Sequence, residues 1–296
     1  MTKHLNGELG IPGSVRISAG NGGLPMVMLT HASGSSAEVY LHGAHIASWK
    51  NRAGEELLFL SRESHWAEDK PIRGGIPVIF PQFGGSGPLP QHGFARTSAW
   101  QLLSTELLDS GVVSVELKMN ETDVSLAIWP HRYVLRMNVL LDANVLAVGV
   151  RVTNTGDQPF DFQTALHTYF RVADIGRTAV VGLRGVTYTD SLLDDVSAVE
   201  DRDTVLFDQE TDRVYIDAPD LLRVEDECGG RTIAVEKRNM PDVVVWNPWI
   251  AKSRRMPDFG DDEYLRMVCV ETGAIETRPS LFPGESWDGE TTFLSG

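Results

Sequence analysis

Four runs of residues in the middle of the chain alternate between apolar and polar side chains, and this alternation constrains the fold more than any other feature. Short turn signals (DSG, WPH and DAN) separate the runs, which cover residues 99–108, 112–120, 133–142 and 145–153. A period of two is typical of a strand with one buried face, and turns this short join antiparallel neighbours. The sequence therefore predicts an antiparallel meander.

Similar short runs continue on both sides of this meander, so we expect an all-β protein. A helical pattern fits in two places only, as one turn at Ser64–Asp69 and weakly at Ser191–Asp203. No linker, internal repeat or low-complexity segment marks a domain boundary. The prediction is one domain over residues 1–296, a single large antiparallel β-sandwich, with residues 1–24 as an N-terminal extension and edge.

The formal net charge of −15 argues against partners that need a basic surface. Lysine and arginine form no block, so we expect neither nucleic acid nor an anionic membrane as a partner. A small anionic ligand stays compatible with this charge, because distant charges are screened beyond ~8 Å at physiological salt. Such a ligand would need arginines placed close to it.

The cysteines and the N-terminal residues indicate the compartment. Cys228 and Cys269 form neither a metal motif nor a CxxC pair, so a reducing compartment is the simpler interpretation and a disulfide between them is the alternative. The first residues hold no apolar segment of the secretory type, and no apolar run approaches the length of a membrane span. We expect a cytoplasmic protein, and a monomer.

Residues 70–100 break the alternation. Prolines and glycines punctuate an apolar core, Ile76 to Phe80, and polar side chains are interspersed. That many breakers exclude a regular strand, while an exposed connector would not need Phe83 and Phe94. We interpret this segment as a buried, irregular backbone that fixes polar side chains, which is how binding sites are commonly built.

Glu271 is a candidate general base. On the predicted strand Tyr264–Glu271 it ends an apolar row formed by Leu265, Met267 and Cys269. Partial desolvation raises the pKa of a carboxyl group towards the range that proton transfer uses. The alternative is a side chain that turns out to solvent where the strand ends.

His167 is a candidate acid or base in the middle of the predicted strand Phe160–Arg171. It belongs to a polar row in which Gln163 and Tyr169 are its neighbours on the same face. Such a row faces water or a ligand cleft, and an imidazole with a pKa near ~6.5 can donate or accept a proton there. The alternative is a structural or surface histidine.

Arg73 and Arg96 flank the irregular segment and are candidate anion ligands, since a guanidinium binds carboxylate or phosphate oxygens. Each could equally serve as a structural ion-pair partner. His92, between Gln91 and Arg96, has a turn residue as its alternative interpretation. Asp212 enters a strand, and nothing local distinguishes it from the other acidic residues.

Two further patterns do not develop into sites. His42 and His45 point to opposite faces if they lie on a strand, and no third ligand follows at a usual spacing. The glycine-rich stretch 84–87 lacks the lysine and the helix start of a phosphate loop. We therefore predict no metal site.

Seven stretches in consistent order carry a resemblance to a known family: IRGGIPVIFPQFG, LPQHGFAR, IWPHRY, TALHTYFRV, GLRGVTYTD, VVWNPW and DFGDDEYLRMVCVETG. Together, over residues 25–294, the chain resembles the hexose-6-phosphate mutarotases. These are the glucose-6-phosphate 1-epimerases of the galactose mutarotase-like superfamily. The resemblance implies the family's fold, a single large β-sandwich.

The resemblance also implies roles for individual residues. The family's catalytic histidine and glutamate fall on His167 and Glu271. Its substrate-binding positions fall on Arg73 in RGGIP, on Gln91 and Arg96 in PQHGFAR, on Asp212 in ETDRVY and on a second active-site histidine, His92. The chain has VETG where relatives often carry proline after the glutamate, which leaves the glutamate in place.

The implied reaction interconverts the α and β anomers of D-glucose 6-phosphate at C1. Ionised Glu271 would take the proton of the C1 hydroxyl while protonated His167 donates one to the ring oxygen. The ring opens, C1 rotates about the C1–C2 bond, and closure on the other face reverses the roles. Arg73 and Arg96 would hold the 6-phosphate. No redox step or leaving group occurs, so we expect no cofactor.

Two other functions remain open. An aldose 1-epimerase acting on free hexoses such as galactose would use the same pair, and only the arginines argue against it. A non-catalytic carbohydrate-binding or sensor protein could have the same sandwich, because a fold does not decide function. A glycosidase would need two carboxylates beside the scissile bond, whereas here the candidate acid is a histidine.

Overall fold

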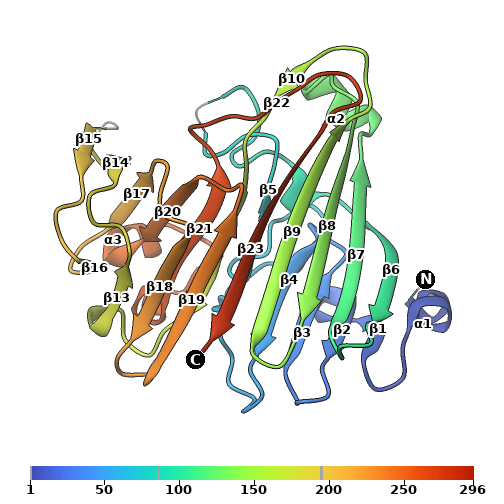
Figure 1. Ribbon diagram of the computed structural model, residues 1–296, viewed down its shortest axis with the longest axis horizontal. Helices are drawn as coiled ribbons and strands as arrows, with labels where there is room; N and C mark the ends of the chain where they lie inside the picture. The colour runs from blue at the N-terminus through green and yellow to red at the C-terminus, as the bar shows by residue number, and fades with distance from the viewer. Residues whose placement is uncertain (1, 86, 194–195) are drawn as a thin grey trace.

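The computed structural model describes residues 2–85, 87–193 and 196–296. Over these ranges, long antiparallel strands form two layers, which confirms the predicted all-β sandwich (Figure 1). The helical segments are short: α1 (Thr2–Leu9), α2 (Asp123–Ile128), α3 (Trp249–Ser253) and the single 3₁₀ turns η1 (Asn21–Gly23), η2 (Ala95–Thr97), η3 (Ile175–Arg177) and η4 (Glu263–Arg266). None of the described helices is long and apolar enough to span a membrane.

One layer is a sheet of nine strands within the described residues. Their order is β16 (Thr204–Leu206), β13 (Thr178–Val181), β18 (Leu221–Asp226), β19 (Arg231–Arg238), β23 (Ser286–Ser295), β9 (Val145–Asn154), β8 (Tyr133–Leu141), β7 (Val113–Asn120) and β6 (Gln101–Leu107). Strands β6 to β9 pair consecutively and antiparallel, as the alternating runs predicted. The odd-numbered positions of β8 are buried, which is the expected period of two.

The other layer contains two sheets, counted over the described residues. The larger has the order β15 (Val196–Val199), β14 (Thr187–Asp190), β17 (Thr211–Tyr215), β20 (Asp242–Asn247), β21 (Met267–Ala274), β11 (Thr164–Leu166) and β5 (Val78–Ile79), with β12 (Tyr169–Arg171) also on β21. The smaller has the order β1 (Val15–Ala19), β2 (Pro25–Thr30), β3 (Ser36–Tyr40) and β4 (His45–Lys50). A separate pair, β10 (Phe160–Asp161) and β22 (Ser280–Leu281), lies at one end (Figure 1).

Strands β20 and β21, in the middle of the larger sheet, are buried on both faces. Along β21, Val268 and Val270 belong to the central core between the layers. The members of this core come from the whole sequence, from Val15 to Phe293. The alternate side chains of β21 and β20 point the other way, into a second apolar cluster that includes Met267, Cys269, Val244, Trp246, Phe59 and Phe259. This outer cluster supplies the apolar surroundings for any polar group placed among its members.

The predicted strand Phe160–Arg171 is wrong as one continuous element, because it is divided into β10, β11 and β12. Between these pieces the backbone forms hydrogen bonds with the irregular segment 70–100 and not with a regular strand. The N–H of Gln163 donates to the carbonyl of Pro81, and the N–H of His167 donates to the carbonyl of Pro77. The predicted faces survive the interruptions. Phe160, Phe162 and Leu166 belong to the central core, and Ala165 and Tyr169 to the outer cluster.

Three smaller expectations also need correction. The strand predicted from Tyr264 begins at Met267, because the preceding residues form η4, so Leu265 is not part of its row. The weak helix at Ser191–Asp203 is wrong, since Val196–Val199 pair with β14 as strand β15, while residues 194–195 lie outside the described ranges. Ser64–Asp69 contains bends and turns and no helix.

The segment 70–100 is irregular, as predicted, and its first half is buried. Ile72, Ile76 and Phe80 are at most 2% exposed, whereas most described residues from 84 to 91 are exposed; position 86 lies outside the described ranges. Gly93 shows why glycine is needed here. Its φ is +69°, and a Cβ atom at this position would lie 2.1 Å from the carbonyl oxygen of Phe80.

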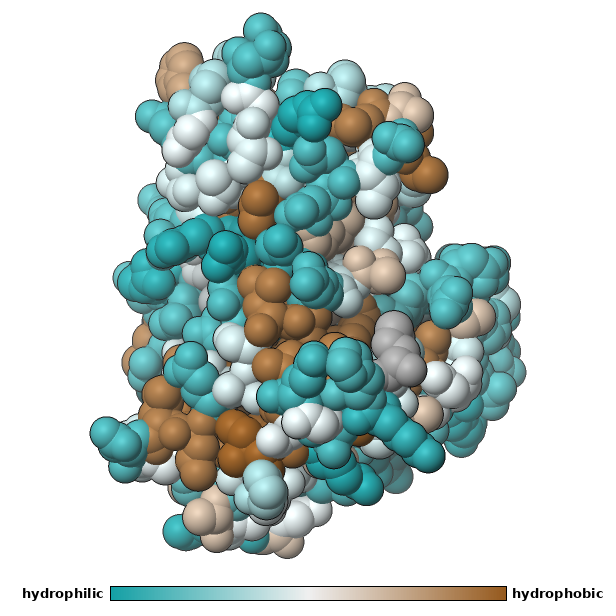
Figure 2. Space-filling view, turned by 90° about the vertical axis from the view of Figure 1, so that its right-hand side faces the viewer, coloured by the Kyte–Doolittle hydropathy of each residue, from teal (hydrophilic) through white to brown (hydrophobic). Residues whose placement is uncertain are grey.

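Apolar surface is also exposed at the edge of the nine-stranded sheet. Figure 2 views the face that carries β6 and α1, and hydrophobic surface gathers in its middle. A hollow of about 490 Å³ lies between α1 and the start of β6, lined by Leu5, Leu24, Leu41, Trp100 and Leu102 among others. Because the lining is mainly apolar, this hollow offers little for acid–base chemistry.

Candidate active site

The structure brings His167 and Glu271 into contact. Strands β11 and β21 pair antiparallel with Leu166 opposite Thr272. His167, which follows Leu166, therefore comes next to Glu271, which precedes Thr272. The Nδ1 atom of His167 lies 3.2 Å from Oε1 of Glu271. The two residues are 7% and 1% exposed, so the alternatives of a surface histidine and a solvent-facing glutamate are wrong.

Aromatic rings fix the orientation of the His167 imidazole. The ring of Tyr169 stacks on it with centroids 4.7 Å apart and planes inclined by only 7°. The rings of His92 and Trp246 meet it edge-on, at centroid distances of 5.4 and 6.1 Å. These contacts leave the imidazole little rotational freedom, so its nitrogens keep fixed directions.

Both members of the pair favour their neutral forms. Burial lowers the pKa of His167 well below its usual value of 6.5, and the positive charge of Arg96 lowers it further. Burial and the carboxylate of Asp212 raise the pKa of Glu271 well above its usual value of 4.5. The protonated histidine and ionised glutamate that the implied reaction uses are therefore not the forms that the free protein favours. The polar row predicted around His167 is closed in by aromatic rings from other elements, and a closed site penalises charge.

A cavity of about 370 Å³ opens beside the pair. Its lining residues include six of the seven predicted site residues: His167, Glu271, Arg73, Gln91, His92 and Asp212. The seventh, Arg96, is not among them, but its guanidinium donates to the carbonyl of Gln91 at 2.9 Å. The predicted residues, which span about 200 positions of sequence, thus come together at one place.

Arg73 is held by two partners, Tyr169 in the cavity lining and Asp258 outside it. Its Nη1 donates to the hydroxyl of Tyr169 at 3.0 Å, and its Nη2 lies 3.1 Å from Oδ2 of Asp258. Although burial alone would lower the pKa of Arg73, Tyr169 and Asp258 raise it, so the guanidinium stays charged. Arg73 is thus both an ion-pair partner and a fixed positive charge facing the cavity.

In contrast to Arg73, Arg96 and His92 have pKa values that their surroundings lower. Burial and repulsion by Arg73 lower the pKa of Arg96 to about 10. Burial and the charge of Arg96 lower the pKa of His92 to about 3, which keeps this imidazole neutral. A cation destabilised in this way gains from an anionic ligand, because the ligand's charge offsets the repulsion between the arginines.

Sequence reasoning missed several residues of the cavity wall. Lys252, on α3, has its Nζ 3.2 Å from Oδ2 of Asp212 and 5.5 Å from the ring centroid of Trp246. Tyr169 and Trp246 enclose His167, and Asp258 anchors Arg73. Tyr169 was identified as a same-face neighbour of His167, but no local signal pointed to Lys252 or Asp258. Only the folded chain brings Lys252 to the cavity and Asp258 to Arg73.

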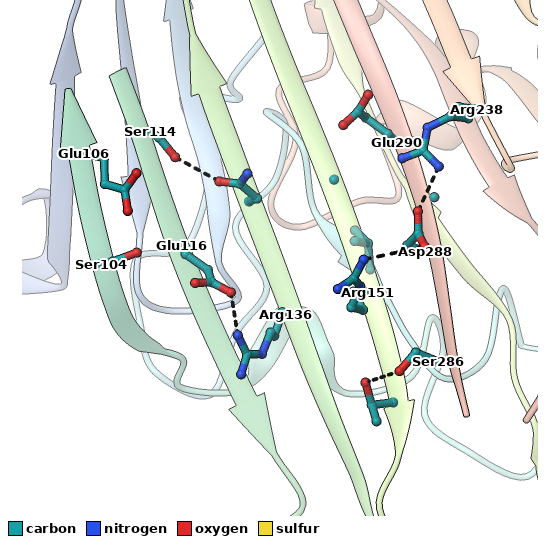
Figure 3. Close-up of a pocket in the computed structure, with 15 residues that line it drawn as sticks. Ser104, Glu106, Ser114, Glu116, Arg136, Arg151, Arg238, Ser286, Asp288 and Glu290 are labelled. Carbon is teal, nitrogen blue, oxygen red and sulfur yellow. Dashed lines mark hydrogen bonds and ion pairs between the residues drawn. The ribbon is translucent and has the colours of Figure 1, made fainter. Parts of the chain in front are cut away.

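A larger hollow, of about 660 Å³, lies on the outer face of the nine-stranded sheet. Figure 3 shows that its charged side chains face one another: Arg136 lies 2.9 Å from Glu116, and Arg151 and Arg238 both contact Asp288. These charges compensate each other on an exposed sheet. The hollow contains no buried acid–base pair comparable to His167 and Glu271 among its described residues.

The structure also shows the surroundings of the two histidines considered as metal ligands and of the two cysteines considered as a disulfide. His42 Nε2 lies 2.7 Å from the carbonyl oxygen of Lys70, and burial lowers the pKa of His45 to about 3. These two histidines are therefore part of the packing. Both cysteines are unpaired, with Cys228 exposed and Cys269 buried, so the disulfide alternative is wrong.

Comparison with known proteins identifies the family. A family model described as aldose 1-epimerase matches residues 25–294. The chain belongs to the aldose 1-epimerase family. Within it, a protein from Cenchrus ciliaris that is provisionally named a glucose-6-phosphate 1-epimerase is 42% identical over 276 residues, which are 90% of this chain and 83% of that protein. A protein from Escherichia coli (strain K12) with the same provisional name is 35% identical over 258 residues, or 86% of this chain and 85% of that protein.

Solved structures agree with this family. A crystal structure from Salmonella typhimurium, provisionally described as a mutarotase, has a TM-score of 0.89 and 28% identity, and the match covers 97% of this chain and 95% of that one. A galactose mutarotase related enzyme from Lactobacillus acidophilus shares the fold at a TM-score of 0.75 and 16% identity, over 92% of this chain and 97% of that one. The predicted galactose mutarotase-like fold is confirmed.

Proposed function

We propose that this protein is an isomerase that interconverts the α and β anomers of hexose 6-phosphates, with D-glucose 6-phosphate as the substrate to test first. The observation that carries the proposal is the buried contact of 3.2 Å between His167 Nδ1 and Glu271 Oε1 beside a cavity that positive side chains line. Anomerisation needs one acid and one base and nothing else from the protein. The provisional name of the relatives from Cenchrus ciliaris and Escherichia coli supports the same substrate class.

The pair works as a unit that holds one proton. In the free protein burial favours that proton on Glu271. His167 Nδ1 and Glu271 Oε1 lie 3.2 Å apart without forming a hydrogen bond, so a small realignment of the two side chains precedes the transfer that gives the ionised glutamate and the charged imidazole. Glu271 Oε2, which has no hydrogen-bond partner among the described residues, then takes the proton of the C1 hydroxyl. His167 donates from Nε2 to the ring oxygen, and the ring opens. Rotation about C1–C2 and closure in the reverse sense give the other anomer.

The 6-phosphate is the group that the positive side chains suit. Arg73 and Lys252 line the cavity, and Arg96 lies behind Gln91 with its charge acting on the pair. A phosphate in this environment would restore the ordinary pKa of Arg96 and would make charge-assisted hydrogen bonds. Asp212 would bind sugar hydroxyls, as the resemblance implies, and His92 would contribute a neutral imidazole.

Polarimetry on freshly dissolved α-glucose 6-phosphate, with a coupled dehydrogenase specific for the β anomer as a second readout, tests the proposal. We expect the protein to accelerate approach to equilibrium well above the spontaneous rate. Parallel runs with α-galactose and α-glucose separate the alternatives: acceleration only of the free sugars would favour an aldose 1-epimerase of free hexoses. Acceleration of neither class, with binding retained, would favour the non-catalytic alternative.

The pKa shifts of the pair predict a broad pH optimum. The pKa of His167 is lowered and that of Glu271 is raised, so the pair keeps one proton over the whole interval between the two values. We expect kcat to stay flat through neutral pH, whereas an isolated histidine of ordinary pKa would lose half its charge near ~6.5. The measurement is kcat at saturating substrate, because the substrate phosphate itself titrates near ~6. An inflection of kcat near the ordinary histidine pKa would contradict this prediction.

Arg96→Ala should distinguish phosphorylated from free sugars. On binding we expect the Arg96 guanidinium, which donates to the Gln91 carbonyl in the free protein, to turn to the phosphate. Because a charge-assisted hydrogen bond contributes about 1.5–3 kcal/mol, KM for glucose 6-phosphate should rise by about ten- to a hundredfold in the variant. KM for free glucose should change much less. Arg255→Ala, which removes an exposed arginine outside the cavity lining, is the matched control and should leave both values unchanged. Equal losses on both sugars would refute the phosphate role of Arg96.

A further inference from the structure

A third side chain that could bind a metal ion, Cys269, lies beside the proposed acid–base pair. Cys269 and Glu271 are two residues apart on β21, so their side chains share one face, and His167 faces them from the neighbouring chain segment. One ligand atom from each residue, namely an imidazole nitrogen, the thiol sulfur and a carboxylate oxygen, lies within 4.8 Å of the others. Nitrogen, sulfur and oxygen donors at one point are the set that zinc-like cations prefer.

The donors are built into the protein and are not committed elsewhere. Cys269 is fully buried and unpaired, and Glu271 and His167 are nearly so. Glu271 Oε2 and His167 Nδ1 are buried polar atoms without a hydrogen-bond partner in the described part of the chain, since the approach of Nδ1 to Glu271 Oε1 at 3.2 Å is not a hydrogen bond. Buried polar atoms are normally satisfied, so two such atoms at one point indicate a ligand. The cavity beside the pair gives an ion a route from solvent and room for a further ligand.

The distances suit tetrahedral coordination. Bond lengths of about 2.0–2.3 Å to nitrogen, oxygen and sulfur place the ligand atoms of such a site about 3.3–3.7 Å apart. The separation of 3.2 Å between His167 Nδ1 and Glu271 Oε1 already matches one edge. One ligand atom of each of the three residues lies within 4.8 Å of the others, so these atoms need to approach by no more than about 1 Å to reach such separations.

The charges also balance. A divalent cation bound by one thiolate, one carboxylate and one neutral imidazole forms a group of zero net charge, which burial tolerates better than either anion alone. Among the surrounding charges, Arg73 is paired with Asp258 and Lys252 with Asp212. Arg96 opposes a cation at this position, so the site should bind the ion reversibly.

We propose that His167, Cys269 and Glu271 form an inhibitory site for a thiophilic divalent cation such as Zn²⁺ or Co²⁺. The ion takes the lone pairs of the two groups that move protons, so its binding stops the reaction. Cys269 has no part in the proton transfers themselves. The inhibition rests on the function proposed above, whereas the binding of the ion does not depend on it.

Titration of the metal-free protein with Co²⁺, read by absorption, tests the binding. We expect one equivalent of Co²⁺ to produce a cobalt–thiolate charge-transfer band in the near ultraviolet, which Zn²⁺ removes by competition. In Cys269→Ala the band should disappear and the dissociation constant for Zn²⁺ should rise by more than about 100-fold, the upper range for loss of an outer-shell partner. Cys228→Ala, which removes the exposed cysteine, is the matched control and should bind like the wild type.

Activity with and without Zn²⁺ completes the experiment. Cys269→Ala should keep the basal rate and need far more Zn²⁺ for inhibition, while thermal unfolding verifies that the variant is folded. Absence of the band in the wild type, or its persistence in Cys269→Ala and loss in Cys228→Ala, would overturn the proposed site. A Co²⁺ band that depends on Cys269 in a protein without epimerase activity would leave the metal site standing and refute the proposed function instead.

Discussion

Glu271→Gln should lower kcat for anomerisation of α-glucose 6-phosphate by roughly 10²–10⁴-fold, the usual contribution of a positioned acid or base. The amide keeps the size and shape of the side chain but cannot take the proton of the C1 hydroxyl. Because burial raises the pKa of Glu271 and favours its neutral form, a neutral amide at this position should not destabilise the fold. Polarimetry gives the rate, and thermal unfolding gives the stability.

The matched control for this variant is Glu276→Gln. Glu276 follows β21 closely but is exposed, so the same chemical change there should leave the rate unchanged. A Glu271→Gln protein that is folded and retains the wild-type rate would exclude Glu271 from the chemistry. A protein that loses activity together with its cooperative unfolding transition would call for Glu271→Asp, which keeps the carboxylate and should retain more activity than the amide.

His167→Ala should cost a similar factor, roughly 10²–10⁴-fold in kcat. The substitution removes the imidazole from between the rings of Tyr169, His92 and Trp246 and leaves a space of its own shape. Free imidazole added to the assay should therefore restore part of the activity, which a merely structural role of His167 would not predict. His65→Ala, at an exposed histidine, is the control and should behave like the wild type with and without imidazole.

The double variant of His167 and Glu271 adds a sharper test. Residues that act as a unit give grossly non-additive losses, so the double variant should be about as slow as the slower single variant. Losses that multiply would show that the two side chains act independently, and the shared-proton arrangement would then be wrong.

The alternation of the sequence determined which side chains share a face, and this part of the fold was predictable. Ala165 and Tyr169 lie on one face and Phe160 and Phe162 on the other, although the strand that carries them is interrupted. The interruptions of this strand were not predictable. Its backbone N–H groups donate to carbonyl groups of residues some 80 to 90 positions earlier in the chain. The local alternation of apolar and polar residues predicts which side chains share a face of a strand. It does not predict which distant backbone groups accept the hydrogen bonds of that strand.

The site shows the same division. Glu271 stood out because it ends an apolar row, His167 because it lies in a polar row in mid-strand, and Arg73 and Arg96 because they flank the irregular segment. The family resemblance added the roles of Gln91, His92 and Asp212. The forms that His167 and Glu271 favour in the free protein were not predictable, since the sequence does not show that Trp246 and His92 close in on His167 from separate segments. Lys252 and Asp258 were missed for a related reason. Tertiary packing brings Lys252 to the cavity and Asp258 to Arg73, and neither residue has a local pattern around it.

The contact between His167 and Glu271 has a consequence for how each turnover ends. The proton that one oxygen of the sugar gives up and the proton that the other receives both pass through groups only 3.2 Å apart. Ring closure in the reverse sense returns each proton to the group that supplied it, so the pair ends a turnover with the one proton with which it began. A catalyst arranged in this way resets itself with every cycle, and it treats the two anomers alike because neither direction leaves it short of a proton.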